Sequence, residues 1–130
     1  QAGEVRQPHA DRYVEVMRRA VSAAVARLAP KDRIRLGYYY ADGLTLAQIG
    51  RALNEHEATV SRNLARARRD IRRDVERQLR DQEHMSAGQI DECFAAVVDD
   101  VGALDVADLL GERKDSRDER SKERPEGASA

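Results

Sequence analysis

The sequence is poor in several residue types, and each shortage excludes a class of protein. Its 130 residues include one cysteine, one phenylalanine, three prolines and no tryptophan. A single cysteine cannot form an internal disulfide or a cysteine-rich zinc site, and it is typical of a reducing cytoplasm. No apolar run approaches the roughly 20 residues of a membrane span, so the sequence predicts no transmembrane segment. No signal peptide is visible, and Gln1 in place of Met suggests a fragment of a longer protein.

The near-neutral total charge conceals a division along the chain. The formal net charge is −1. Residues 12–82 carry 16 basic and 9 acidic residues, whereas residues 83–112 carry eight acidic residues and neither Lys nor Arg. Such an asymmetry indicates a part that binds a polyanion beside an acidic part.

Apolar residues recur at steps of three and four, which is the period of a helix. The pattern predicts helices over about 14–28, 31–41, 45–53, 57–82, 86–101 and 105–110, and no strand. We therefore expect an all-α fold with a four-helix domain at 12–82 and a two-helix acidic extension at 83–112. Residues 1–11 are expected to form a linker. Residues 113–130 have mixed charge and no apolar residue larger than Ala, which predicts a disordered tail.

Local signals mark where several helices begin and end. Thr45 with Gln48, and Ser86 with Gln89, have the spacing of capping boxes. Asn54 tolerates the left-handed conformation that ends a helix, and we expect it between the helices at 45–53 and 57–82.

Nothing in the sequence predicts catalysis. His9, His56 and His84 lie on separate segments, with no Ser-His-acid or Cys-His grouping, no glycine-rich phosphate loop and no metal-ligand spacing. Cys93 lies on an apolar stripe, so we expect a small buried hydrophobe. The sequence therefore predicts no enzyme, no cofactor and no metal site.

The segment 44–73 has the pattern of a helix-turn-helix: a short capped helix, a tight turn and a second helix. Gly50 is small where the two helices must cross closely, and Val60 and Leu64 anchor the second helix. That second helix is expected to expose Ala58, Ser61, Arg62 and Arg66, together with Glu57, on the side away from its apolar stripe. Residues near the N-terminus of such a helix reach base edges in the major groove.

Further arginines extend this positive surface, and we expect them to face phosphates. They are Arg68, Arg69, Arg72 and Arg73. An arginine-rich helix can also be a solvated surface, which is the better interpretation of the charges alone. The charges together with the capping box, Gly50 and the turn favour nucleic-acid binding instead.

The motifs are similar to those of region 4 of bacterial RNA polymerase sigma factors, most of all the extracytoplasmic-function type. The similarity covers about residues 18–80 and includes AVARLAPKDRIRLGYYYADGLTLAQIGRALNEHEATVSRNLARARRDIRR. Its elements are Leu28 to Pro30, Asp42-Gly43, Thr59 to Arg62, and Arg66 to Arg68. The later segment MSAGQIDECFAAVVDDVGALDVADLL resembles a C-terminal extension found on some of these factors.

The resemblance implies recognition of the −35 promoter element and docking on the β-subunit flap of RNA polymerase. The residues expected to contact DNA are Thr45, Ala58, Thr59, Ser61, Arg62, Arg66, Arg69 and Arg73. Tyr38 and Tyr39 are expected to contact the polymerase, although the Tyr38–Tyr40 run also has rings enough to fill the core. The resemblance further implies a place in the bacterial cytoplasm, at the nucleoid, and an anti-sigma factor as a possible partner. A region 2 is expected upstream of Gln1.

Three departures and two alternatives accompany this resemblance. Asn54 stands in place of the usual glycine of the turn, and His56 and Glu57 stand in place of the usual Ser-Arg start. Glu55 stands where the family usually has a small apolar residue, which we expect to weaken packing of the turn. Glu57 places an acid near the DNA. These acids and the acidic extension suit a protein-interaction module that keeps the fold but has little DNA affinity. A LuxR-type DNA-binding output domain shares the four-helix plan and is the other alternative.

The acidic extension has its own apolar stripe, which must pack on something. We expect it to pack on Val75 and Leu79 at the end of the long helix and on the first helix. Its eight acids would then lower the positive potential of the arginine-rich helix.

Overall fold

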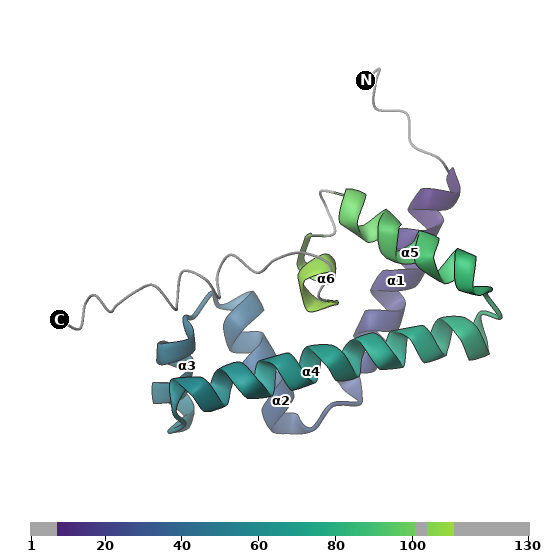
Figure 1. Ribbon diagram of the computed structural model, residues 1–130. Coiled ribbons are helices and arrows are strands. Elements are labelled where there is room, and N and C mark those ends of the chain that lie inside the picture. Colours follow the sequence, from purple (N-terminus) through teal and green to yellow (C-terminus); the bar gives the residue numbers. More distant parts are fainter. Residues whose placement is uncertain (1–7, 101–103, 111–130) are drawn as a thin grey trace, which may run out of the picture.

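The computed structural model describes residues 8–100 and 104–110 and confirms an all-α fold, with no strand in those ranges (Figure 1). Its elements are α1 (Pro8–Ala26), α2 (Pro30–Leu36), η2 (Gly37–Ala41), α3 (Leu46–Leu53), α4 (Glu57–Arg77), η3 (Gln78–Gln82), α5 (Ala87–Asp99) and α6 (Leu104–Leu109). The expected disordered tail at 113–130 and most of the expected linker lie outside the described residues.

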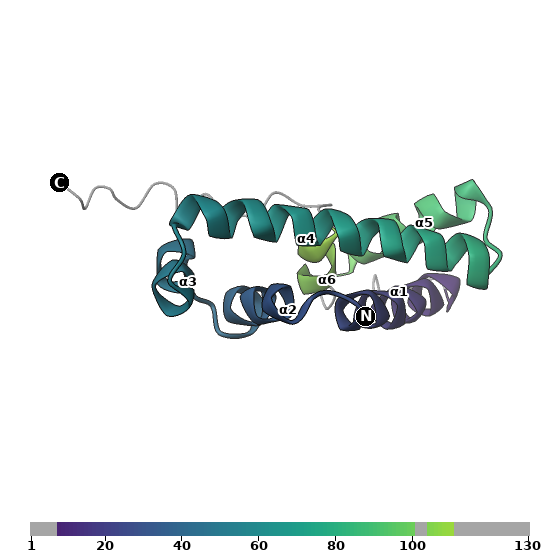
Figure 2. The same ribbon diagram turned by 90° about the horizontal axis from the view of Figure 1, so that it is seen from below.

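Helix α4 runs along the length of the molecule, and most other helices pack on one side of it. Figure 2 shows α3, α2 and α1 following one another along this side, with α5 near the end formed by η3. The cause is a continuous apolar stripe on α4 and η3 that is completely buried, as the sequence predicted. Its residues are Val60, Leu64, Ala67, Ile71, Val75 and Leu79.

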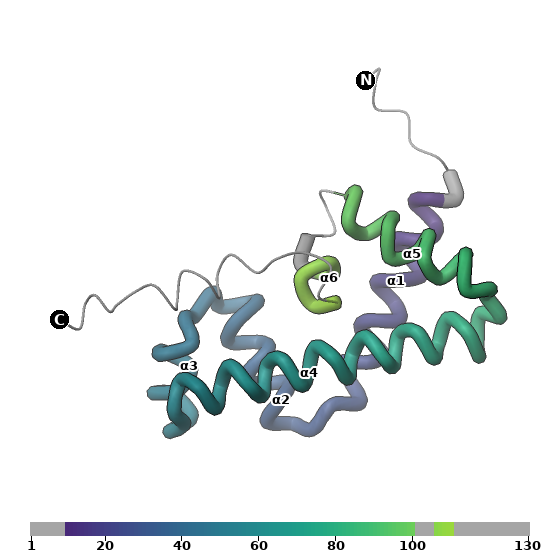
Figure 3. The backbone as a smooth tube through the Cα atoms, in the orientation of Figure 1, coloured from purple at the N-terminus to yellow at the C-terminus, as the bar shows by residue number. Residues whose placement is uncertain are grey.

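Two junctions in the chain are built in the same way. In each, a helix ends in one wide π turn, one residue adopts a positive φ, and a capping box starts the next helix. The positive φ belongs to Gly43 (69°) in the first junction and to His84 (56°) in the second. The capping boxes are the predicted ones: the backbone N–H of Thr45 donates to Gln48 Oε1 at 2.9 Å, and that of Ser86 donates to Gln89 Oε1 at 2.9 Å. At the second junction the chain turns back, so that α5 packs across α1 (Figure 3).

The acidic extension shares one hydrophobic core with the helix-turn-helix part. Phe94, Val97 and Leu110 are buried in the same cluster as Val14 and Met17 of α1. The predicted packing of the extension on α1 and on the end of α4 is therefore confirmed. Cys93 is completely buried, and burial raises the pKa of its thiol to about 11, with Glu92 and Glu83 adding to the effect. It is a small core residue, as expected.

The buried face of α2 is not the apolar one. Ile34, a large apolar residue of this helix, has 46% of its surface exposed. Asp32, Arg35 and Leu36 are the buried residues of α2 instead. The helix lies where the sequence predicted it, and the burial of Asp32 and Arg35 was not predicted because their partners Arg66 and Glu55 come from distant segments.

Candidate nucleic-acid interface

The turn between α3 and α4 is closed by Gly50. Its carbonyl oxygen accepts a hydrogen bond from the Glu55 N–H at 2.8 Å, and Asn54 has the predicted left-handed conformation, with φ of 58°. A Cβ atom on Gly50 would lie 2.4 Å from the carbonyl oxygen of Glu55. Only glycine allows this approach, so the small residue predicted here is required by the backbone of the turn and not by a crossing of the two helices.

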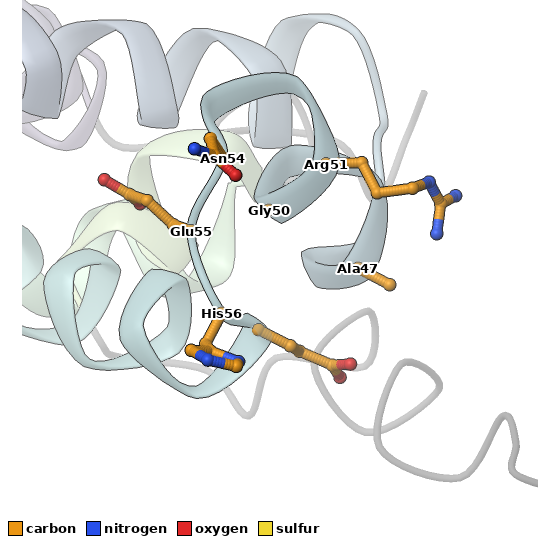
Figure 4. Close-up of a pocket in the computed structure, with 7 residues that line it drawn as sticks. Ala47, Gly50, Arg51, Asn54, Glu55 and His56 are labelled. Carbon is orange, nitrogen blue, oxygen red and sulfur yellow. The ribbon is translucent and has the colours of Figure 1, made fainter.

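Beside this turn the surface has an open hollow of about 390 Å³. Ala47, Gly50 and Arg51 of α3 line it together with Asn54, Glu55, His56 and Glu57 (Figure 4). The Arg51 and Glu55 side chains extend to opposite sides of the turn. The backbone N–H groups at the start of α4 have no side-chain cap, because His56 makes no capping hydrogen bond.

The outer face of α4 carries a row of arginines opposite the buried stripe. Arg62, Arg66, Arg69 and Arg73 follow one another at steps of four, three and four residues and are all exposed. Such steps keep side chains on one face of a helix. Arg73 has 74% of its side chain exposed, and its guanidinium lies 3.7 Å from the carboxylate of Asp70.

The smaller residues predicted to contact DNA lie near the start of the same helix. Ala58 is exposed, whereas Thr59 and Ser61 are half-buried. Thr59 Oγ1 accepts a hydrogen bond from Arg62 Nη2 at 3.3 Å, which steadies that guanidinium. Thr45 is half-buried as the cap of α3, where its Oγ1 accepts the Gln48 N–H at 3.2 Å.

Two arginines that the sequence predicted to face phosphates instead make contacts within the protein, which corrects that prediction. Arg68 donates from Nε to the hydroxyl of Tyr40 at 2.9 Å. Arg72 donates to the carbonyl oxygen of Leu110 at 2.9 Å, and its guanidinium lies 4.3 Å from the ring centre of Phe94. Each precedes an arginine of the outer row by one residue, which rotates it about 100° toward the buried stripe. Both therefore hold the fold together.

A comparison with protein families matches residues 18–71 to the family described as Sigma-70, region 4. These residues are a sigma-70 region 4 domain. No curated protein and no solved structure matches the chain. The matched segment begins within α1 and ends within α4, so it contains the whole helix-turn-helix, whereas α5 and α6 lie beyond it.

Region 4 of sigma factors recognises the −35 promoter element in transcription initiation, and its partners are promoter DNA and the RNA polymerase core. The match favours this interpretation over the LuxR-type domain and the interaction module. Region 4 is a DNA-binding regulatory domain rather than an enzyme family. In residues 8–100 and 104–110 no helix has the length and apolarity needed to cross a bilayer, and no three potential ligands come together as a metal site.

The tyrosine run of the region 4 domain divides between core and surface. Tyr39, predicted to contact the polymerase, is completely buried, so its ring offers no surface to a partner in this structure. Tyr38 and Tyr40 are half-buried. Successive residues of a helical turn point in different directions, which is why only one of the three rings is completely buried.

A buried ionic cluster, which the sequence analysis missed, joins α2 to the turn and to α4. Arg35 donates to Asp32 at 2.7 Å and to both carboxylate oxygens of Glu55, at 3.1 and 2.6 Å. Lys31 lies 3.3 Å from Glu55, and Arg66 donates to Asp32 at 2.8 Å. Glu55 therefore ties the turn to α2, which overturns the expectation that it weakens packing. In an arginine-rich sequence these residues look like ordinary surface charges, and no local signal reveals that they meet.

This cluster predicts a loss of stability in acid. The hydrogen bond from Arg35 lowers the pKa of Glu55, Lys31 lowers it further, and burial opposes both. A lowered pKa stabilises the fold above the usual glutamate range, from about pH 5 upward, and this contribution is lost as the pH falls through the lowered pKa. Urea unfolding at pH 7 and at pH 3.5 should show a smaller acid-induced drop for Glu55→Gln than for the wild type. Glu57→Gln, at the exposed glutamate two residues on, is the control and should keep the wild-type drop.

Proposed function

We propose that α4 enters the major groove of the −35 promoter element and that its outer arginine row makes the contacts. The observation that carries this proposal is the position of that row, opposite the buried stripe of a region 4 helix-turn-helix. Arg62 reads a base edge, because it is exposed and lies in the second turn of α4, near the end of the helix that approaches the bases. Arg69 and Arg73 lie further along and contact phosphates. Thr45, Ala58, Thr59 and Ser61 complete the interface around the start of α4.

We propose the remaining contacts and the setting from the resemblance to the sigma-70 family. Tyr38, half-buried in η2, is our proposed contact with the β-subunit flap of RNA polymerase. The domain at 12–82 and its acidic extension at 83–112 would form the C-terminal part of a factor of the extracytoplasmic-function type. Such a factor acts at the bacterial nucleoid, and an anti-sigma factor is its natural regulator.

Two substitutions distinguish base reading from phosphate contact. A duplex is first selected from a randomised pool with the 130-residue chain, and a scrambled duplex serves for comparison. Arg62→Ala should weaken binding to the selected duplex by about 1–3 kcal/mol and relax the preference at one position. Arg69→Ala should weaken binding to both duplexes alike and reduce the salt slope by about one. Fluorescence anisotropy over a salt series measures both.

The control is Arg19→Ala, which removes an equal charge from α1, where Arg19 is 3.5 Å from Glu15. It should leave the selected-to-scrambled ratio at its wild-type value. Selection that enriches no sequence, or equal losses for Arg62→Ala and Arg19→Ala, would contradict the proposed reading helix.

A further inference from the structure

One arginine of the outer row differs from the others in how it is held. Arg66 Nη2 donates to both carboxylate oxygens of Asp32, each at 2.8 Å, and Nη1 donates to Asn63 Oδ1. Nearly half of its side chain, 46%, is still exposed. Arg62, in contrast, has one hydrogen bond, to a hydroxyl. Arg66 therefore reaches the interface with its guanidinium already fixed.

The residue that fixes it is itself immobile. The side chain of Asp32 is 8% exposed, and Oδ1 also accepts from Arg35. Arg35 is in turn held by Glu55 of the turn. Because a buried carboxylate in such a cluster cannot follow a surface side chain outward, Arg66 keeps the position that Asp32 sets. The orientation of one interface arginine is thus coupled to α2 and to the turn.

We propose that Asp32 is a positioning residue that sets the sequence selectivity of α4 by restraining Arg66. The proposal deepens the proposed function and rests on it. A free arginine reaches phosphates of any sequence, so it strengthens binding without discriminating. An arginine held by a buried carboxylate offers its remaining donors in one place only. It therefore stabilises a complex whose acceptor lies there and leaves other complexes without that contact.

Releasing Arg66 should raise general affinity and lower selectivity. Asp32→Asn removes one charge and the two-oxygen contact. Binding to the scrambled duplex is expected to tighten by about threefold or more, with a salt slope steeper by about one as Arg66 gains a phosphate. The selected-to-scrambled affinity ratio should fall by about fivefold or more, within the range that one base contact supplies.

The experiment is a double-mutant cycle on that ratio, measured by anisotropy with the full chain and the duplexes described above. The variants are Asp32→Asn, Arg66→Gln and the pair together. Asp81 is exposed, pairs with Arg80 at 3.2 Å and follows the arginine row in the chain. Asp81→Asn is the charge-matched control, since it also removes one carboxylate. It should leave the ratio unchanged. If Asp32 acts through Arg66, Asp32→Asn should have no effect on the ratio in the Arg66→Gln background.

Asn63→Ala keeps the proposal testable where Asp32→Asn fails to fold, because Asn63 lies on α4 and holds Arg66 from the other side without touching Arg35. Asn63→Ala should also lower the selected-to-scrambled affinity ratio, and it should do so only in a chain that keeps Arg66. An unchanged ratio in the folded Asp32→Asn or Asn63→Ala variant overturns the proposal, as does an equal loss in the Arg66→Gln background. A wild-type chain with no preference between duplexes would instead contradict the proposed function itself.

Discussion

Phe94→Ala is expected to lower the free energy of unfolding by about 3–5 kcal/mol, although Phe94 lies outside the matched region 4 segment. The side chain is 5% exposed and belongs to the same core as Met17 of α1 and Val75 of α4. Truncation removes this packing and leaves a cavity. It also removes the ring that lies under the guanidinium of Arg72, and so one link between the extension and α4.

Thermal and urea unfolding followed by circular dichroism measure this loss. Ile34→Ala is the control, because Ile34 is a large apolar residue with 46% of its surface exposed and should cost well under the loss at Phe94. A single cooperative transition is expected for both variants, since one core joins all the helices. An early, separate transition in the Phe94 variant, with the rest of the chain melting as in the wild type, would show that the extension is an independent unit.

A shared core also limits what the acidic extension can do. Its apolar residues are committed to α1 and α4, and α6 is tied to α4 by the hydrogen bond from Arg72 to Leu110. A regulator could not lift the extension away without exposing Phe94 and Val97. Its exposed acids, among them Asp91 and Glu92, would instead act through their field, which salt screens.

The elements that the sequence predicted best depend on neighbours in the chain. Thr45 and Gln48 are three residues apart, so their capping box forms whatever packs nearby. The buried stripe of α4 was equally clear, because it holds its period from Val60 to Leu79. Asn54 combined a residue type with a position between two helices, which was enough to place the turn.

The features that escaped prediction depend on partners far along the chain. Asp32 can be buried because Arg66, 34 residues later in the chain, donates a hydrogen bond to its carboxylate. Arg72 turns away from the outer arginine row because Leu110, 38 residues later, offers a carbonyl oxygen. In both cases the local sequence shows only a charged residue on a helix. Such contacts decide which arginines of α4 remain in its exposed outer row.

Gly50→Ala is expected to impair the helix-turn-helix more than any other single methyl group added to it. The new Cβ would meet the carbonyl oxygen of Glu55 at 2.4 Å, and this neighbour is backbone that cannot rotate away. The turn must open, which strains the Glu55 N–H bond to the Gly50 carbonyl and the contact between Glu55 and Arg35. Overpacking of this kind costs about 1–3 kcal/mol of stability. Because α4 would also shift against α3, we expect affinity for the selected duplex to fall about tenfold or more, equivalent to about 1.4 kcal/mol or more.

Gly88→Ala is the matched control, since it makes the same substitution in the first turn of another helix. There a new Cβ would lie 3.9 Å from Ser86 Oγ, an ordinary van der Waals contact, so this neighbour does not have to move. Alanine is a better helix former than glycine, so this variant should be more stable by about 0.5–1 kcal/mol and should bind DNA as the wild type does. Anisotropy and thermal melts on the two variants thus separate the crowding at Gly50 from the general effect of replacing a helical glycine. Equal DNA affinity for Gly50→Ala and Gly88→Ala would mean that the turn tolerates a wider angle, and that the close approach at Gly50 is not what sets α4 for the major groove.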